Sequence, residues 1–574
     1  MREPASGVAP LAPVIVGCTL ALAATAGSLE AQDRPWTLPG DSLLRAGVLA
    51  WDRGDYPEAL EHYLEALRND RGAERVRELA ALTGEVYTTT DIAPDGDDLE
   101  MAPDGAYMSF RTSEDGETVT KVVEVGTGEV VATLPAEVTA LGPNGQVAYL
   151  TTIGPAIAAA RRADANATGR QARVDARRAL RLAIARDSEV RIRDLATGAD
   201  RVEEVAGLQF DLVWAVDQLH VVGMTDEGRG MIWDTANDRD IFRGAPGYPV
   251  SMRITGATAI VQIDDEPIVP VEGAEVSSEP GAMFGTWRSG SIVFGRRIQG
   301  SEITVSEAGD VFAYVTRDDE GRPALGVGMP EVPGVPAGAI DRILYTPDTR
   351  FADPVVSPDG RWVAFAQIDI HDWEIMAMST ETGEIVRVTD HIHHDRRPQW
   401  VGDRILAVRG EGRHQRSYLY HVERVGEPLK LFHNNTIRTI APEYQWVATP
   451  DGSAVFIVAE RDGDTVSPER GVYKVDLERP VTRGDIERRL RAMAEAEASL
   501  RERGAASFRA MAEAIAPVTE AIDPTRVAMY AADLYRFGSK NIRAEGGGNR
   551  RAIDYLVETL EGWGYEPILD WWQI

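Results

Sequence analysis

The residues best suited to chemistry lie in one short run, HIHHDRR, at residues 391–397. Imidazole and carboxylate groups are common ligands of zinc and related ions. Because alternate residues of a strand face opposite sides, His391 and His393 can share a face. With His371 and Asp395 they form a candidate metal site. The competing interpretation is a polar loop whose side chains satisfy the backbone of a turn.

A stripe of arginines suggests a second chemistry, the binding of anionic groups. Arg170, Arg173, Arg177 and Arg181 fall on one face of a helix predicted within residues 155–187. They are the candidate binding residues of a lid or docking helix. The alternative is a solvated helix whose arginines pair with nearby carboxylates.

Motifs of several enzyme classes are absent from the sequence. It contains no G-x-S-x-G nucleophile elbow, no H-E-x-x-H helix, no P-loop and no glycine-rich dinucleotide turn. Cys18 is the only cysteine, which excludes intramolecular disulfides and thiolate metal clusters. We therefore predict no catalytic residue and no cofactor within this chain.

The charge and length of the chain limit its partners and its organisation. Its 574 residues are enough for at least three modules. With 60 Lys and Arg against 91 Asp and Glu, the formal net charge is −31, and so acidic a surface repels phosphate backbones. We expect no nucleic-acid partner.

The N-terminal segment predicts export. No charged residue lies between Glu3 and Glu30, and SLEAQD offers a small-residue cleavage site after Ala31. Residues 1–31 are therefore predicted to be a signal peptide. The alternatives are a lipoprotein with a lipid on Cys18 of IVGC, or an uncleaved membrane anchor. Each places the body outside the cytoplasm, in the periplasm or secreted.

Residues 36–86 predict a helical hairpin. RGDYPEALEHYLEAL places Ala59, Leu60, Tyr63 and Leu67 in one apolar stripe at helical spacing. The segment resembles a single tetratricopeptide hairpin. One such repeat is short for a peptide-binding groove, so a cap on the next module is the favoured interpretation.

A repeated strand motif fills residues 87–481. APDGAYMSF, GPNGQVAYL, SPDGRWVAF and TPDGSAVFI share a tight turn followed by an alternating strand. Asp104 and Asn144 lie 40 residues apart, whereas Asp359 and Asp451 lie 92 apart, or twice 46. These intervals match propeller blades of ~40–50 residues. Recurrent Thr-Gly turns should supply a glycine where φ is positive.

The best-matched stretch, Phe351–Asp403, resembles the TolB-type, WD40-like propeller repeat: a P-D-G turn before a strand, a variable hairpin, then R-x-T. Counting the strand units gives a mainly β fold of six or seven blades, with an N-terminal helical hairpin before it and a helical insertion at about 155–187. The resemblance implies a protein or peptide partner. Membrane contact is expected only through the N-terminal alternatives.

The C-terminal region is predicted to be helical and then α/β. Residues 482–520 form linker helices, and Asp523-Pro524 supplies an N-cap and first helical position. Residues 523–574 resemble the opening of the secreted di-zinc exopeptidases related to aminopeptidase Y and glutaminyl cyclase, at Phe537–Asn541 and Ala552–Tyr565. No metal ligand of that family matches here, so zinc is implied only for the missing part of an incomplete domain.

Two functions follow from the sequence. In the first, the chain is the exported N-terminal accessory part of a zinc aminopeptidase-like protein, without a catalytic core and inactive alone. In the second, it is a stand-alone extracytoplasmic scaffold that binds proteins. Neither identifies a substrate or a partner.

Overall fold

The computed structural model describes residues 41–567 except 84–85, 116, 152–154, 257, 264–280, 289, 330–341, 370–371, 391–392, 412–413, 423, 432–442, 461–469, 510 and 538–547. None of the helices within these ranges is long and apolar enough to cross a bilayer. The chain divides into two compact units, residues 1–494 and 495–574.

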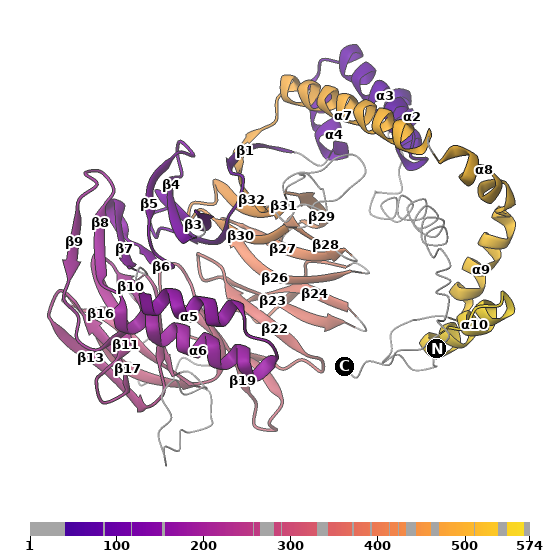
Figure 1. Ribbon diagram of the computed structural model, residues 1–574. Helices are drawn as coiled ribbons and strands as arrows, with labels where there is room; N and C mark the ends of the chain where they lie inside the picture. Colours follow the sequence, from indigo (N-terminus) through magenta and orange to yellow (C-terminus); the bar gives the residue numbers. More distant parts are fainter. Residues whose placement is uncertain are drawn as a thin grey trace, which may run out of the picture. The chain divides into compact units, whose positions relative to one another are not determined.

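The described strands of the first unit form eight antiparallel sheets of four strands, the blades of a β-propeller (Figure 1). Blade 1 consists of β2 (Asp97–Met101), β3 (Tyr107–Glu114), β4 (Glu117–Glu124) and β5 (Val130–Leu134), and blade 2 consists of β6 (Val138–Leu141), β7 (Gln146–Leu150), β8 (Val190–Asp194) and β9 (Asp200–Glu203). Blade 3 consists of β10 (Leu208–Ala215), β11 (Gln218–Met224), β12 (Arg229–Asp234) and β13 (Arg239–Pro246), and blade 4 consists of β14 (Val250–Thr255), β15 (Thr258–Ile263), β16 (Gly281–Arg288) and β17 (Ser291–Gln299).

Blades 5 to 8 complete the ring. Blade 5 consists of β18 (Ser301–Val305), β19 (Phe312–Arg317), β20 (Pro323–Gly328) and β21 (Arg342–Tyr345), and blade 6 consists of β22 (Phe351–Val356), β23 (Trp362–Asp369), β24 (Asp372–Ser379) and β25 (Ile385–Arg387). Blade 7 consists of β26 (His394–Val401), β27 (Arg404–Glu411), β28 (His414–His421) and β29 (Arg424–Lys430), and blade 8 consists of β30 (Glu443–Ala448), β31 (Ala454–Glu460), β32 (Arg470–Pro480) and β1 (Tyr87–Ala93). Because β1 is the outer strand of blade 8, the start of the propeller is hydrogen-bonded to its end.

The mainly β propeller is confirmed, but the predicted six or seven blades is wrong, since the structure has eight. The error lies between Val205 and Ile343, where three complete blades occur without a P-D-G turn. Blade 3 turns tightly at Val216, whose φ is 57°, and blade 5 turns through Ser306–Asp310. The motif is one way to make the turn, so counting motifs undercounts blades.

In the motif copies the turn has a local cause. Asp104, Asp359 and Asp451 each accept a hydrogen bond from the backbone N–H two residues later, at 3.0, 3.1 and 3.0 Å. The residue directly after each aspartate is a glycine in the left-handed region, with φ between 69° and 72°. The glycines of the Thr-Gly turns at 128, 198 and 383 also have positive φ, as predicted.

Apolar side chains hold adjacent blades together. Eight buried clusters occur among the described residues, one at each interface between neighbouring blades. The cluster that joins blades 8 and 1 contains Phe110, Phe456 and Val472, none of which is exposed. The ring is therefore closed by packing as well as by strand pairing.

Each blade has two ends. The turn between its first and second strands lies on what we call the turn face. The end at which the first strand begins lies on the opposite face, with the loop between the second and third strands. In blade 2 that loop contains α5 (Pro155–Ala165) and α6 (Arg170–Asp187), which lie across this insertion face (Figure 1).

Three N-terminal helices and the start of a fourth form a separate apolar cluster. They are α2 (Ser42–Asp52), α3 (Tyr56–Asn69), α4 (Ala73–Thr83) and α7 (Arg483–Arg509). Asp41 caps α2 by accepting from the backbone N–H of Leu43 at 2.8 Å. Tyr63 of α3 is buried in the same cluster as Ile486 and Leu490 of α7. The residues that follow the propeller thus pack with those that precede it.

The second unit contains α8 (Ala512–Ala521), α9 (Pro524–Arg536) and α10 (Gly548–Gly562). The predicted N-cap is confirmed, because Asp523 accepts from the backbone N–H of Thr525 at 2.9 Å. Helices α9 and α10 touch through the rings of Tyr530 and Trp563, with centroids 5.4 Å apart. No residue of α9 is buried within the described part of the chain. Residues 568–574, the end of the predicted α/β segment, lie outside the described residues.

Candidate functional site

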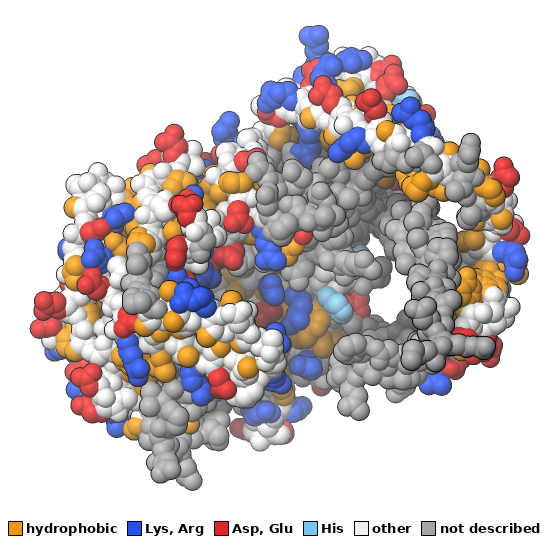
Figure 2. All heavy atoms as spheres, in the orientation of Figure 1, with side chains coloured by type: hydrophobic (Ala, Val, Ile, Leu, Met, Phe, Trp, Pro, Cys, Tyr) orange, Lys and Arg blue, Asp and Glu red, His pale blue; other side chains and the backbone are white. Residues whose placement is uncertain are grey.

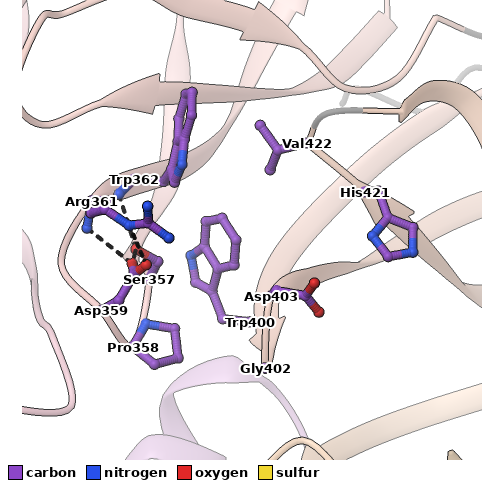
Figure 3. A pocket seen from close by; sticks show the side chains of 10 residues that line it. All are labelled: Ser357, Pro358, Asp359, Arg361, Trp362, Trp400, Gly402, Asp403, His421 and Val422. Atoms are coloured by element: carbon purple, nitrogen blue, oxygen red, sulfur yellow. Dashed lines mark hydrogen bonds and ion pairs between the residues drawn. The ribbon is translucent and has the colours of Figure 1, made fainter.

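A cleft of about 430 Å³ opens on the turn face between blades 6 and 7 (Figure 3). This volume lies within the range of ~300–1,000 Å³ that is usual for ligand sites. One wall comes from the turn after β22, and the other comes from the turn after β26 and the end of β28. The lining residues are Ser357, Pro358, Asp359, Arg361, Trp362, Trp400, Gly402, Asp403, His421 and Val422.

The first wall is fixed by the repeat turn. Ser357 Oγ donates to Asp359 Oδ1 at 2.6 Å and accepts from the backbone N–H of Trp362 at 2.9 Å. Burial opposes ionisation of Asp359, but hydrogen bonds from Ser357 and Arg361 hold the pKa of its carboxyl below the usual value. Arg361 is paired with this carboxylate, and its side chain is 79% exposed.

Two half-buried tryptophans give the cleft its apolar surface. Trp400 lies between the Ser357–Arg361 turn and His421 in Figure 3. Its indole Nε1 donates to the carbonyl oxygen of Val355 at 3.0 Å, so its ring is locked in place. Trp362 packs at the edge of the cluster between blades 6 and 7. Among the described residues the indole N–H of Trp362 has no acceptor, so it is available to a ligand.

The second wall is polar. His421 is half-buried, and its ring makes no hydrogen bond or ion pair with the other described residues. The side chain of Asp403 is 88% exposed. An imidazole ring and a carboxylate therefore lie on the side of Trp400 opposite Arg361 (Figure 3).

This arrangement offers groups that can bind a ligand. The one hydroxyl nucleophile of the cleft, Ser357, donates its proton to Asp359 and lacks a neighbouring histidine base in the part of the chain described. Aromatic surface, one free N–H donor and charges of both signs are instead the usual components of a small recognition site.

The predicted metal residues are only partly described. His371 and His391 lie outside the described residues, so the four-residue site stays a prediction. His393 is half-buried, and Asp395 is fully buried beside Arg409, with 3.4 Å between Oδ1 and Nε. Within the described ranges no group of three or more potential ligand residues is placed to hold a metal ion.

Asp395 belongs to a buried polar network between blades 6 and 7. Arg409 also donates to the hydroxyl of Tyr420 at 2.7 Å, and its guanidinium lies 4.1 Å from the ring centroid of Tyr418. Desolvation, opposed by the charge of Arg409, raises the pKa of Asp395 to about 7. Glu374, which is also buried, accepts a hydrogen bond from the hydroxyl of Thr389.

The four arginines of the predicted stripe lie on α6. Arg170, Arg173 and Arg177 are exposed. The guanidinium of Arg181 lies 5.1 Å from the ring centroid of Phe210 in blade 3, where Ala185 of the same helix is buried. The C-terminal half of α6 is thus held against the propeller, while its N-terminal half presents cations to solvent.

Sequence reasoning missed the cleft. Both tryptophans are visible beside the turns, in SPDGRW and in QWVGD. Their meeting depends on blades 6 and 7 being neighbours with equivalent turns on one face. Aligning these two blades would have found the pair.

No family model and no curated protein matches this chain in sequence. Its fold is similar to that of several solved propellers. The propeller domain of the Trilobed protease from Pyrococcus furiosus is 12% identical, with a TM-score of 0.35, over 59% of this chain and 98% of that one. Pyrococcus horikoshii acylaminoacyl peptidase is 12% identical, with a TM-score of 0.35, over 66% and 59%. The TolB protein of Agrobacterium tumefaciens is 16% identical, with a TM-score of 0.27, over 50% and 95%.

This chain therefore spans about three fifths of the acylaminoacyl peptidase. Similarity at these identities concerns the fold alone. The chain contains a β-propeller of eight four-stranded sheets within its described residues.

Proposed function

We propose that this chain is a recognition protein whose propeller binds an extended peptide segment, with a proline or aromatic side chain seated in the cleft between blades 6 and 7. The observation that carries the proposal is that two tryptophans line the same cleft. The ring of Trp400 is held by its hydrogen bond to Val355, and the indole N–H of Trp362 has no acceptor among the described residues. Aromatic grooves of this kind hold proline-rich segments by ring contact and by hydrogen bonds to peptide carbonyls.

Titration with a fluorescein-labelled decaproline peptide tests this proposal. Trp362→Phe keeps the apolar ring but removes the N–H donor, so we expect affinity to fall about tenfold, as for one lost hydrogen bond in a partly buried site. Trp563→Phe, in the second unit, is the matched control and should bind like the unaltered chain. Failure of the unaltered chain to bind, or equal losses in both variants, would overturn the proposal.

We further propose that the body acts outside the cytoplasm. The support is the charge-free run between Glu3 and Glu30 with a cleavage site after Ala31. N-terminal sequencing of material from a secreting host should give a first residue after 31. A chain that still starts at Met1 in the cytosol would contradict export, and lipid attached to Cys18 would favour the lipoprotein alternative.

A second candidate function is that of an accessory module for a zinc aminopeptidase-like domain. The observation that favours it is the helix pair α9 and α10, in the region that resembles the opening of that family. Zinc would then serve the remainder of that domain and not the described residues. We expect no turnover of chromogenic amino-acid amides with added zinc; chelator-sensitive turnover would require ligands such as His371 and His391.

A further inference from the structure

The insertion face has a group of arginines where β22 and β26 begin. Arg350 immediately precedes β22, whereas Arg396 and Arg397 lie in the first half of β26. Both are the first strands of their blades, and the first strands contact one another around the axis. The three side chains are exposed. They therefore lie at neighbouring positions on the same end of the propeller axis, and Figure 2 shows Lys and Arg side chains gathered there.

Within the described residues none of these three arginines has an ion pair. At the equivalent end of blade 1, by contrast, Asp98 is bound to Arg111 at 2.9 Å. Carboxylates do lie nearby: Asp353 occupies the corresponding bulge of β22, and Glu302 of β18 accepts a hydrogen bond from its backbone N–H at 2.8 Å. The three arginines nevertheless face solvent without a direct ion pair among the described residues, on a chain whose formal net charge is −31.

The backbone and a neighbouring ring fix two of the arginines. Arg397 has a φ of 52°, in the left-handed region that few non-glycine residues adopt, at a bulge in the pairing of β26 with β27. The guanidinium of Arg396 lies 4.5 Å from the ring centroid of Trp373. The first strands of blades 1, 5 and 6 have the same positive-φ bulge, so this recurrent feature of the propeller holds Arg397 in a defined place at the strand end.

We propose that this end of β22 and β26 binds an acidic peptide segment through its carboxylates, which Arg350, Arg396 and Arg397 hold. Guanidinium groups pair with carboxylates through two parallel hydrogen bonds, and two adjacent strands present such groups to successive side chains of an extended ligand. The site lies at the opposite end of the strands from the tryptophan cleft, so it does not depend on the function proposed above. A metal cation is disfavoured here, because it would face these arginines.

The test is fluorescence anisotropy of a labelled hexaglutamate peptide with the full chain at low and at high salt. The unaltered chain should bind, and the affinity should fall as salt screens the charges. The variant R350A/R397G should bind at least tenfold more weakly. It should also fold, because glycine adopts the left-handed conformation of residue 397 without strain.

The matched control is R68A/R71A, which removes the same charge from exposed side chains at the end of α3 and in the loop after it. It should change the affinity less than twofold. The proposal is overturned if the unaltered chain does not bind hexaglutamate, if it binds hexaserine equally well, or if the R68A/R71A variant loses as much affinity as R350A/R397G. Thermal unfolding of both variants shows whether a loss of binding reflects a loss of fold, and if R350A/R397G does unfold, R350A alone must reproduce at least a threefold loss.

Discussion

Two of the buried polar centres in the described propeller differ in position, one lying inside the stretch that carries the repeat motif and one outside it. Between blades 6 and 7, Asp395 and Arg409 are both less than 3% exposed and carry opposite charges. In blade 3, His220 and Asp234 are both fully buried and lie opposite each other in the pairing of β11 with β12.

The two centres satisfy their carboxylates differently. Asp234 accepts from the side-chain and backbone nitrogens of Asn237 at 2.7 and 3.2 Å, within one turn of the chain. Burial lowers the pKa of His220, although Asp234 acts in the opposite direction, so the ring is kept neutral. Asp395 depends instead on a long-range partner from another strand. The difference shows that a blade can bury a carboxylate in more than one way, provided that a hydrogen-bond donor or a cation contacts it.

The largest expected effect comes from removing that long-range partner. Arg409→Ala leaves a buried carboxylate without its cation, and we expect the free energy of unfolding to fall by about 3–5 kcal/mol. Arg361→Ala, at a side chain that is 79% exposed, is the control and should cost less than about 1 kcal/mol. Urea denaturation of both variants measures the difference. A loss below about 1 kcal/mol for Arg409→Ala would show that the ionic centre is dispensable.

The two centres should respond to pH in opposite directions. Because the pKa of Asp395 is raised to about 7, its contribution to stability is complete below its unfolded pKa of about 4 and is lost as the pH rises through 7. The pKa of His220 is lowered, so its contribution is complete above its unfolded pKa of about 6.5 and is lost as the pH falls through the folded value.

Asp395→Asn and His220→Leu separate these contributions. Asp395→Asn should remove a decline in the unfolding free energy of about 2–4 kcal/mol between pH 4 and pH 7, at about 1.4 kcal/mol per pKa unit. His220→Leu should instead make the decline with rising pH steeper. Urea denaturation across this pH range measures both slopes. Equal slopes in the two variants would contradict the assignment of opposite signs.

Much of the fold could be predicted from the sequence, and the limit has a physical cause. Alternation and the Asp-Gly turns identify blades 1, 6 and 8, because Asp104, Asp359 and Asp451 each make the same local hydrogen bond. Blades 3 to 5 have the same consecutive strands, but other residues make their turns, such as Val216 in blade 3 and Ser306–Asp310 in blade 5. These turns do not carry the P-D-G motif, so the motif does not reveal the blades.

The candidate site was less predictable than the fold. The residues singled out for chemistry were histidines, yet Asp395 of that group is a buried partner of Arg409. The tryptophans of the cleft were visible, but they are 38 residues apart in the sequence (362 and 400) and meet only through blade geometry. A site made by the turns of two neighbouring blades depends on how the blades are arranged, whereas a local motif can be read from one stretch of the sequence.

A smaller effect should appear where the turns of adjacent blades touch. Gly452 and Gly402 both have positive φ, so either glycine-to-alanine change should cost about 1–2 kcal/mol in backbone strain. Only at Gly452 would the added Cβ come within 2.7 Å of a backbone atom, the nitrogen of Gly402. Gly452→Ala should therefore lower the free energy of unfolding by about 1 kcal/mol more than Gly402→Ala. Equal losses in urea denaturation would mean that the turns of blades 7 and 8 move apart freely.

The smallest expected effect tests a hydrogen bond from a tryptophan to a backbone carbonyl of the preceding blade, which occurs both inside and outside the stretch with the repeat motif. Trp400 in blade 7 donates its indole N–H to the carbonyl of Val355 in blade 6, and Trp214 in blade 3 donates to the carbonyl of Ala140 in blade 2, each at 3.0 Å. Replacing either tryptophan by phenylalanine keeps most of the apolar contact but leaves a carbonyl without its donor. We expect each variant to lose about 1 kcal/mol in urea denaturation, the usual net value of one hydrogen bond. Similar losses would show that blades with and without the motif are joined in the same way, whereas a loss confined to Trp400→Phe would mean that blades 2 and 3 depend on apolar packing alone.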